Sequence, residues 1–167
     1  MSNILKKAAL AVALVTASLS ANAAQTDIKV WAEVDNNLAL LKADGRPLDD
    51  VVHMGYNPIR GLDTWADQVR IFSNDTTKDV QVRLNSPVEL IPTNTPAGTP
   101  SVPMTVTLNN RVLDVTAKDF TAADLYDGAI PGASVSMELA VAQTTLGKIA
   151  AAGRYEGMVS VILALKP

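Results

Sequence analysis

The sequence predicts an all-β fold, in which two antiparallel sheets pack as a sandwich. Along many short segments apolar residues alternate with polar ones at a period of two, and turn sequences such as Asp44-Gly45 and Asn109-Asn110 separate these segments. The chain has 167 residues. That length suffices for one domain with a hydrophobic core and is too short for two, so a single sandwich is expected.

The first 23 residues have the features of an export signal. Lys6 and Lys7 precede an apolar stretch from Ala8 to Leu19, and Ala21-Asn22-Ala23 is a small-x-small cleavage site. The apolar stretch is shorter than the roughly 20 residues that a membrane-spanning helix needs. We therefore expect cleavage rather than a permanent anchor, with the mature chain beginning at Ala24.

The clearest strand signal follows directly, at Asp27–Asp35. Its apolar face consists of Ile28, Val30, Ala32 and Val34, which alternate with Lys29, Trp31 and Glu33 on the other face. Further strands are expected at Leu38–Leu41, Val51–Tyr56, Val69–Phe72, Val80–Leu84, Met104–Leu108, Val112–Thr116, Val135–Ala142 and Tyr155–Leu165.

Two other kinds of segment interrupt the strands. Four prolines among small and polar residues predict an exposed loop over residues 92–103. The alanine-rich segments Lys118–Tyr126 and Thr144–Ala152 are each expected to hold a short helical turn.

Composition argues against several classes of function. The formal net charge of −3 becomes −5 without the first 23 residues, because Lys6 and Lys7 are lost and all 17 acids remain (12 − 17 = −5), so a nucleic-acid partner is not expected. There is no cysteine, and His53 is the sole histidine. No metal or cofactor site is therefore expected.

No catalytic constellation is found in the sequence. Asp49 and Asp50 are adjacent acids that point to opposite faces of a strand or are solvated in a loop, and His53 is expected to be structural. Asn74-Asp75-Thr76 matches a glycosylation sequon but is also ordinary turn chemistry. The chain is therefore not expected to be an enzyme. A sugar-stacking platform built from some of its seven aromatic residues stays open as an alternative.

The two ends of the chain carry the most informative pattern. The segment Tyr155–Leu165 is almost continuously apolar, and no sequence follows it to supply a neighbouring strand. An unpaired strand of this kind is a template for aggregation. The strand at Asp27–Asp35 is by contrast surplus. A strand missing at one end and spare at the other predicts head-to-tail strand exchange between copies.

Five collinear segments resemble the major pilins of the alternate chaperone–usher pathway, the shaft subunits of colonization factor antigen fimbriae and cable pili. The resemblance covers nearly all of the mature chain, and it is carried by Ile28–Val34, Leu40–Gly45, Ser73–Lys78, Val112–Phe120 and Gly153–Ser160. It implies an incomplete immunoglobulin-like β-sandwich that lacks its last strand. Residues 1–23 would be the signal peptide, 24–36 an N-terminal donor-strand extension, and 37–167 the pilin domain.

The same resemblance implies a function: a structural major subunit of an adhesive surface fimbria, which polymerises by donor-strand exchange. Its partners would be other copies of itself, a periplasmic chaperone, an outer-membrane usher and a minor tip adhesin, and it would pass through the periplasm to the cell surface. The alternative is an exported carbohydrate-binding sandwich or a tip adhesin. Relatives often carry a proline just after the donor strand, where this chain has Asn36.

The resemblance also implies the site residues. The donor side chains would be Ile28, Val30, Ala32 and Val34. The acceptor groove and chaperone contact would use one face of the terminal strand, namely Tyr155, Val159, Val161, Leu163 and Leu165. Because the strand is apolar on both faces, Met158 and Ile162 are the alternative inward set. We expect an apolar groove beside residues 155–165, and exposed side chains at Ile28, Val30 and Val34.

Overall fold

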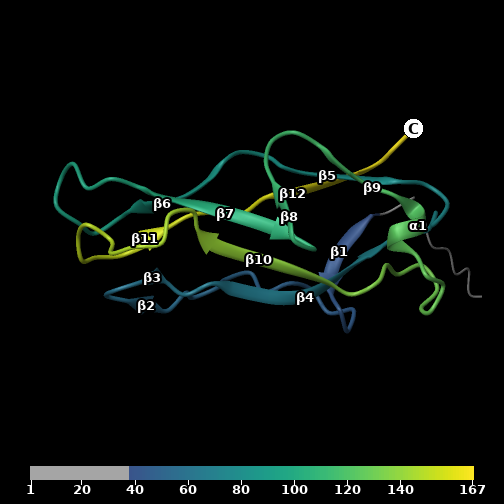
Figure 1. Ribbon diagram of the computed structural model, residues 1–167, viewed down its shortest axis with the longest axis horizontal. Coiled ribbons are helices and arrows are strands. Elements are labelled where there is room, and N and C mark those ends of the chain that lie inside the picture. Colours follow the sequence, from purple (N-terminus) through teal and green to yellow (C-terminus); the bar gives the residue numbers. More distant parts are fainter. Residues whose placement is uncertain (1–37) are drawn as a thin grey trace, which may run out of the picture. The chain divides into compact units, whose positions relative to one another are not determined.

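The computed structural model describes residues 38–167, which form two antiparallel sheets, one short hairpin and one helical turn (Figure 1). The larger sheet has the strand order β1 (Ala39–Lys42), β4 (Trp65–Phe72), β10 (Met137–Gln143), β7 (Val102–Leu108), β6 (Val88–Pro92) and β11 (Tyr155–Glu156), and β8 (Arg111–Leu113) also pairs with β7. The smaller sheet has the order β12 (Val161–Leu165), β5 (Val80–Leu84) and β9 (Lys118–Phe120). The hairpin joins β2 (Tyr56–Asn57) to β3 (Gly61–Leu62), and the helical turn is α1 (Ala122–Leu125).

The core lies between the two sheets. In β5 of the smaller sheet every second residue is buried, with Val80 and Val82 fully buried and Leu84 3% exposed. In β7 of the larger sheet Val106 and Leu108 are likewise fully buried. These residues belong to one cluster of packed side chains, so the alternation that predicted the strands also produces a sandwich with a shared core.

The turn between β7 and β8 follows the sequence prediction closely. Asn109 and Asn110 have φ angles of 50° and 61°, and Leu108 pairs with Arg111 across them. Two consecutive residues with positive φ give the type I′ geometry that suits the twist of a two-residue hairpin, and asparagine tolerates this region better than most residues.

Several expected elements differ from the structure. Of Val51–Tyr56 only Tyr56 lies in a strand, and Val51 is 86% exposed, because no described strand pairs with residues 51–55. Thr144–Ala152 contains no helix. Lys118–Tyr126 divides into β9 and α1, with the Thr121 side chain accepting a hydrogen bond from the Asp124 amide as the N-cap.

Two further differences involve the terminal segment and its partner. Tyr155–Leu165 is not one strand: β11 belongs to the larger sheet and β12 to the smaller one, and residues 157–160 cross between them. The strand β6 was not expected, because Glu89 and Pro92 weaken its pattern. Pro92 closes β6 at the start of the expected loop, and the loop ends where β7 begins at Val102, so that the expected range 92–103 is trimmed at both ends.

Among residues 38–167, no helix is long and apolar enough to cross a membrane.

A buried hydroxyl links β4 to the segment before β10. Ser134 is fully buried, its Oγ accepts a hydrogen bond from the Ile71 amide at 2.8 Å, and the same hydroxyl donates to the Val135 carbonyl at 2.8 Å. Without this hydroxyl the Ile71 amide loses its acceptor inside the core.

We expect Ser134→Ala to lower the free energy of unfolding by about 1–3 kcal/mol, the cost of leaving a buried donor unsatisfied. Ser136→Ala is the matched control, because the Ser136 hydroxyl binds Gln68 on the exposed surface, and it should change stability by less than about 0.5 kcal/mol. Denaturant unfolding of the three proteins measures both values. Equal stability of the two variants would contradict a role for the buried hydroxyl.

Candidate functional site

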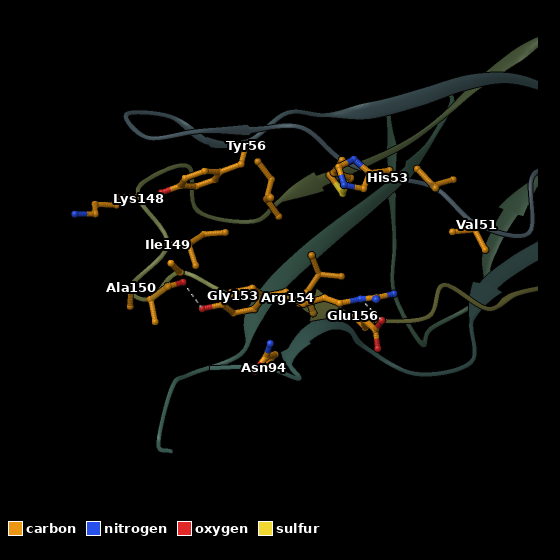
Figure 2. Close-up of a pocket in the computed structure, with 18 of the residues that line it drawn as sticks. Val51, His53, Tyr56, Asn94, Lys148, Ile149, Ala150, Gly153, Arg154 and Glu156 are labelled. Atoms are coloured by element: carbon orange, nitrogen blue, oxygen red, sulfur yellow. Dashed lines mark hydrogen bonds and ion pairs between the residues drawn. The ribbon is translucent and has the colours of Figure 1, made fainter. Parts of the chain in front are cut away.

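A partly open cavity of about 1440 Å³ lies between two segments that are far apart in sequence. One wall is formed by residues 50–54 and Tyr56, and the other by residues 148–157. Figure 2 shows Val51, His53 and Tyr56 along one side, facing Gly153, Arg154 and Glu156 along the other. The apolar side chains of Leu62, Leu90 and Ile149 complete the lining, so the cavity exposes part of the hydrophobic interior.

Two glycines hold the second wall against the larger sheet. A Cβ atom on Gly157 would collide with the carbonyl oxygen of Glu89, and one on Gly153 would collide with the carbonyl oxygen of Asn94. Between them, Tyr155 pairs with Pro92, and the Thr93 amide donates to the Arg154 carbonyl at 2.8 Å. The two glycines of the Gly-x-Tyr-x-Gly pattern therefore allow β11 to lie close to the backbone of β6 and of the loop that follows it.

Tyr155 lies at the centre of this pattern. Its ring is half-buried and packs against the core, and its hydroxyl donates a hydrogen bond to the Ala151 carbonyl at 2.9 Å. The aromatic ring thereby lines the cavity while its hydroxyl keeps a hydrogen-bond partner.

The strand β12 has one paired edge and one open edge. It pairs with β5 from Val161↔Leu84 to Leu165↔Val80, and no strand in the described part of the chain pairs with its other edge. The side chains of β12 that pack against the core are Val161, Leu163 and Leu165. All three are only half-buried, whereas Val80 and Val82 on the neighbouring strand are fully buried. The core is therefore open along β12.

The other sheet has a similar border. β1 is the edge strand of the larger sheet, and Leu40 packs against the core while staying half-buried. Both sheets therefore end in an edge strand whose core-facing side chains are incompletely covered.

Hydrogen bonds fix the end of β12. The Lys166 amide donates to the Asp79 carbonyl at 2.9 Å, and the Lys166 ammonium lies 2.6 Å from the Asp119 carboxylate on β9. The hydrogen bonds from Lys166 and Gln81 hold the pKa of Asp119 below its usual value, and the same carboxylate raises the pKa of Lys166. The C-terminal end of β12 is thus attached to β9 and to the residue that precedes β5.

Large apolar side chains are exposed around these features. Val51 and Met158 are 86% and 79% exposed, and Val52 and Val159 are 39% and 38% exposed. Val51 and Val52 come from one wall of the cavity, and Met158 and Val159 come from the crossing between β11 and β12. A concentration of exposed aliphatic groups beside an open core is typical of an interaction site.

The structure brings together part of the predicted site. Tyr155, Val161, Leu163 and Leu165 all pack against the core, while Val159 lies in the crossing segment and Ile162 is not among the residues packed there. Ile28, Val30, Ala32 and Val34 lie outside the described residues. Sequence reasoning missed the opposite wall, residues 50–54, because Val51, Val52 and Met54 made this segment resemble a paired strand.

The structure places each of the residues weighed for catalysis. Asp49 pairs with Lys42 at 2.8 Å, and this hydrogen bond raises the pKa of Lys42. Asp50 and His53 are exposed and line the cavity. In residues 38–167 no group of three or more potential metal ligands occurs.

The fold is that of a pilin subunit. The structure superposes on the CooA pilin subunit from enterotoxigenic Escherichia coli with a TM-score of 0.63 and 23% sequence identity, covering 77% of this chain and 86% of that one. The prediction of an all-β, immunoglobulin-like sandwich is confirmed.

Sequence comparison then gives the family. Residues 24–164 match the family described as CS1 type fimbrial major subunit. A CFA/I fimbrial subunit of Escherichia coli is 36% identical over 96% of this chain and 97% of its own length, and a CS1 fimbrial subunit of Escherichia coli is 30% identical over 93% of both. The chain belongs to the CS1 type fimbrial major subunit family, as its resemblance to the alternate chaperone–usher pilins predicted. Proteins of this family are structural subunits of fimbriae.

We expect Gly157→Ala to weaken the β11–β6 pairing, because the added methyl group displaces the Glu89 carbonyl at a cost of about 1–3 kcal/mol. Amide exchange of Thr93, measured by NMR, should become about tenfold faster or more. Gly45→Ala is the control: Gly45 has a φ of 86° with no atom within 4 Å of the added group, so the variant strains a distant turn. If Thr93 exchange is unchanged in Gly157→Ala, the close approach does not hold β11.

Proposed function

We propose that this protein is the structural major subunit of an adhesive surface fimbria and that it polymerises by donor-strand exchange. In this proposal the segment 24–36 of one copy lies along the open edge of β12 of the next copy and fills the cavity beside β11. The observation that carries the proposal is the half-burial of Val161, Leu163 and Leu165 on a strand with one unpaired edge. A strand added there completes both the hydrogen-bond ladder and the core.

The length of the N-terminal segment supports this proposal. As a strand, Asp27–Val34 would span about 26 Å at roughly 3.3 Å per residue. This length is sufficient to follow β12 and extend into the cavity beside β11. Its inward-facing side chains would be Ile28, Val30, Ala32 and Val34, in agreement with the strict alternation of the sequence.

The positions of the chain ends support a filament rather than a closed pair. In Figure 1, β1, where the described chain begins, lies toward the same end of the domain as α1, while the β2–β3 hairpin and β11 lie toward the opposite end. If the donor strand leaves its own copy at the α1 end, a linear filament requires that it enter the groove of the next copy at that copy's β11 end. The donor would then run antiparallel to β12 of the copy that receives it, as neighbouring strands do in an all-β sandwich.

The contact would be long-lived. Burial of Ile28, Val30 and Val34 contributes about 5–9 kcal/mol at roughly 1.5–3 kcal/mol each. Each ladder hydrogen bond adds about 0.5–1.5 kcal/mol. Since the donated strand completes the core of its neighbour, release requires partial unfolding, which makes dissociation slow. The joint uses different surfaces on the two copies and does not close, so it generates an open filament.

The proposal includes a route of export and delivery to the cell surface. The family match begins at residue 24, directly after the predicted cleavage site, which supports removal of residues 1–23. In the periplasm an exposed apolar edge needs protection from aggregation. We propose that a chaperone strand occupies the groove until an outer-membrane usher delivers the subunit to the cell surface, with a minor tip adhesin at the end of the fibre.

We expect Val30→Asp to block polymerisation while the chaperone-bound subunit stays folded, because the carboxylate would be buried without a partner in the neighbouring groove. Electron microscopy of the cells and electrophoresis of unheated surface extracts measure fibres and linked subunits. Lys29→Asp introduces the same charge on the outward face and should leave fibres on the cells. Normal fibres from Val30→Asp would refute the donor-strand role.

Deletion of Val161–Pro167 distinguishes a polymer subunit from a free sugar-binding sandwich. The deletion removes β12 and thereby exposes β5, so the subunit should be degraded or aggregate in the periplasm. The periplasmic yield, measured by immunoblotting, should fall at least about tenfold. A yield equal to that of the full chain would indicate a self-contained domain and favour the binding-module alternative.

A further inference from the structure

The end of the domain next to the cavity carries a rigid apolar tip. The tip consists of Ile59 in the turn between β2 and β3 and Leu146 in the loop after β10, which are 85% and 68% exposed. These are two of the most exposed large apolar side chains in the described domain. The two loops adjoin, because the Gly147 amide donates to the Arg60 carbonyl at 3.0 Å.

Hydrogen bonds from two amide side chains hold the tip in one conformation. Gln143 accepts from the Leu62 amide at 3.0 Å and donates to the Gly147 carbonyl at 3.2 Å, so it joins both loops. Asn57 accepts from the amides of Ile59 and Arg60 at 2.9 and 3.1 Å.

Gly61 makes the clamp by Gln143 possible. Its φ is +94°, and a Cβ atom there would collide with the Gln143 side chain and the Gly147 carbonyl. The exposed side chains are thus presented on a fixed backbone, and burying them costs little ordering of the loops.

The two loops of this tip differ in charge from the α1–β10 segment at the opposite end of the domain. The segments 56–62 and 144–149 carry Arg60 and Lys148 and no acid. The segment 121–136, which holds α1 and the loop that follows it, carries Asp124 and Asp127 and no basic residue. None of these four residues forms an ion pair with another described residue. The α1 end also exposes an apolar side chain, since Ile130 is 43% exposed.

We infer that the Ile59–Leu146 tip docks on the α1–β10 loop of the neighbouring copy, with Arg60 and Lys148 facing Asp124 and Asp127. This inference rests on the proposed donor-strand filament. Figure 1 shows the β2–β3 hairpin and α1 toward opposite ends of the domain. In the proposed filament a donor leaving at the α1 end would enter a groove that opens beside the tip, so the tip of one copy would meet the α1–β10 loop of the other. The strand would fix the joint, and the docked ends would orient it and attract the incoming subunit.

The test is a charge exchange. Seeded elongation of fibre ends by the purified, chaperone-held subunit is followed by light scattering at low salt. Arg60→Glu with Lys148→Glu should slow elongation by about tenfold, because like charges then meet at the joint. At about 1 M salt, where the Debye length is roughly 3 Å, the difference should disappear.

The second half of the exchange identifies the partner surface. Asp124→Lys with Asp127→Asn reverses the charge of the α1 end, and the asparagine keeps an acceptor for the Ala129 amide. Combined in one chain with Arg60→Glu and Lys148→Glu, it should return elongation to within about twofold of the original rate. Val112→Asp, at an aliphatic residue that is 55% exposed on β8, is the control for adding a surface charge and should not slow elongation.

The outcomes separate the two proposals. The docking surface is wrong if the chain with Arg60→Glu and Lys148→Glu elongates at the original rate. It is also wrong if the chain that carries all four substitutions stays as slow as that double variant. In both cases the donor-strand joint stands. If Val30→Asp elongates normally, the donor-strand joint itself is wrong.

Discussion

The open edge of β12 is the constraint on which the rest of this structure depends. Val161, Leu163 and Leu165 belong to the same packed cluster as the fully buried residues of β5, and yet they retain solvent exposure because nothing in residues 38–167 covers that side. In an ordinary sandwich the stability of the core and the stability of an interface are separate quantities. In the proposed filament a strand from outside would contribute to both, and the subunit would then gain its final stability on assembly.

The crossing from β11 to β12 explains where the cavity lies. The terminal segment leaves the larger sheet after Glu156 and joins the smaller sheet at Val161, so residues 157–160 bridge the two sheets. Gly153 and Gly157 hold the first part of this path against the backbone of Asn94 and Glu89. Because the path follows β6 there, it leaves a space between itself and residues 50–54, and that space is the cavity. The glycine pattern and the apolar terminal segment thus together set the path of the chain that borders the cavity.

Much of the fold could be predicted from the sequence, because alternation and turn chemistry are local. Val80–Leu84 was predicted with its observed bounds, and Asn109-Asn110 forms the expected turn. What failed depends on distant partners. Val51 and Val52 are apolar and were expected to lie in a paired strand, but no described strand pairs with them and both are exposed. Tyr155–Leu165 divides into two strands because its first part pairs with the larger sheet and its last part with the smaller one. Val161, Leu163 and Leu165, which pack against the core, share one of the two faces that the period of the terminal segment allowed, whereas the facing wall of the cavity has no local signal.

A single interaction does not suffice to build an ordered filament of this kind. In the proposed joint a donated strand would give permanence, but the sequence after the proposed donor strand has Asn36 where a proline would restrict the backbone, so the strand alone would not set the angle between neighbours. A second contact is then needed to define the angle. The clamped Ile59–Leu146 tip and the α1–β10 loop are suited to that role, since they lie toward opposite ends of the domain and carry residues of opposite charge. Their opposite charges also disfavour docking of two like ends, which would terminate growth.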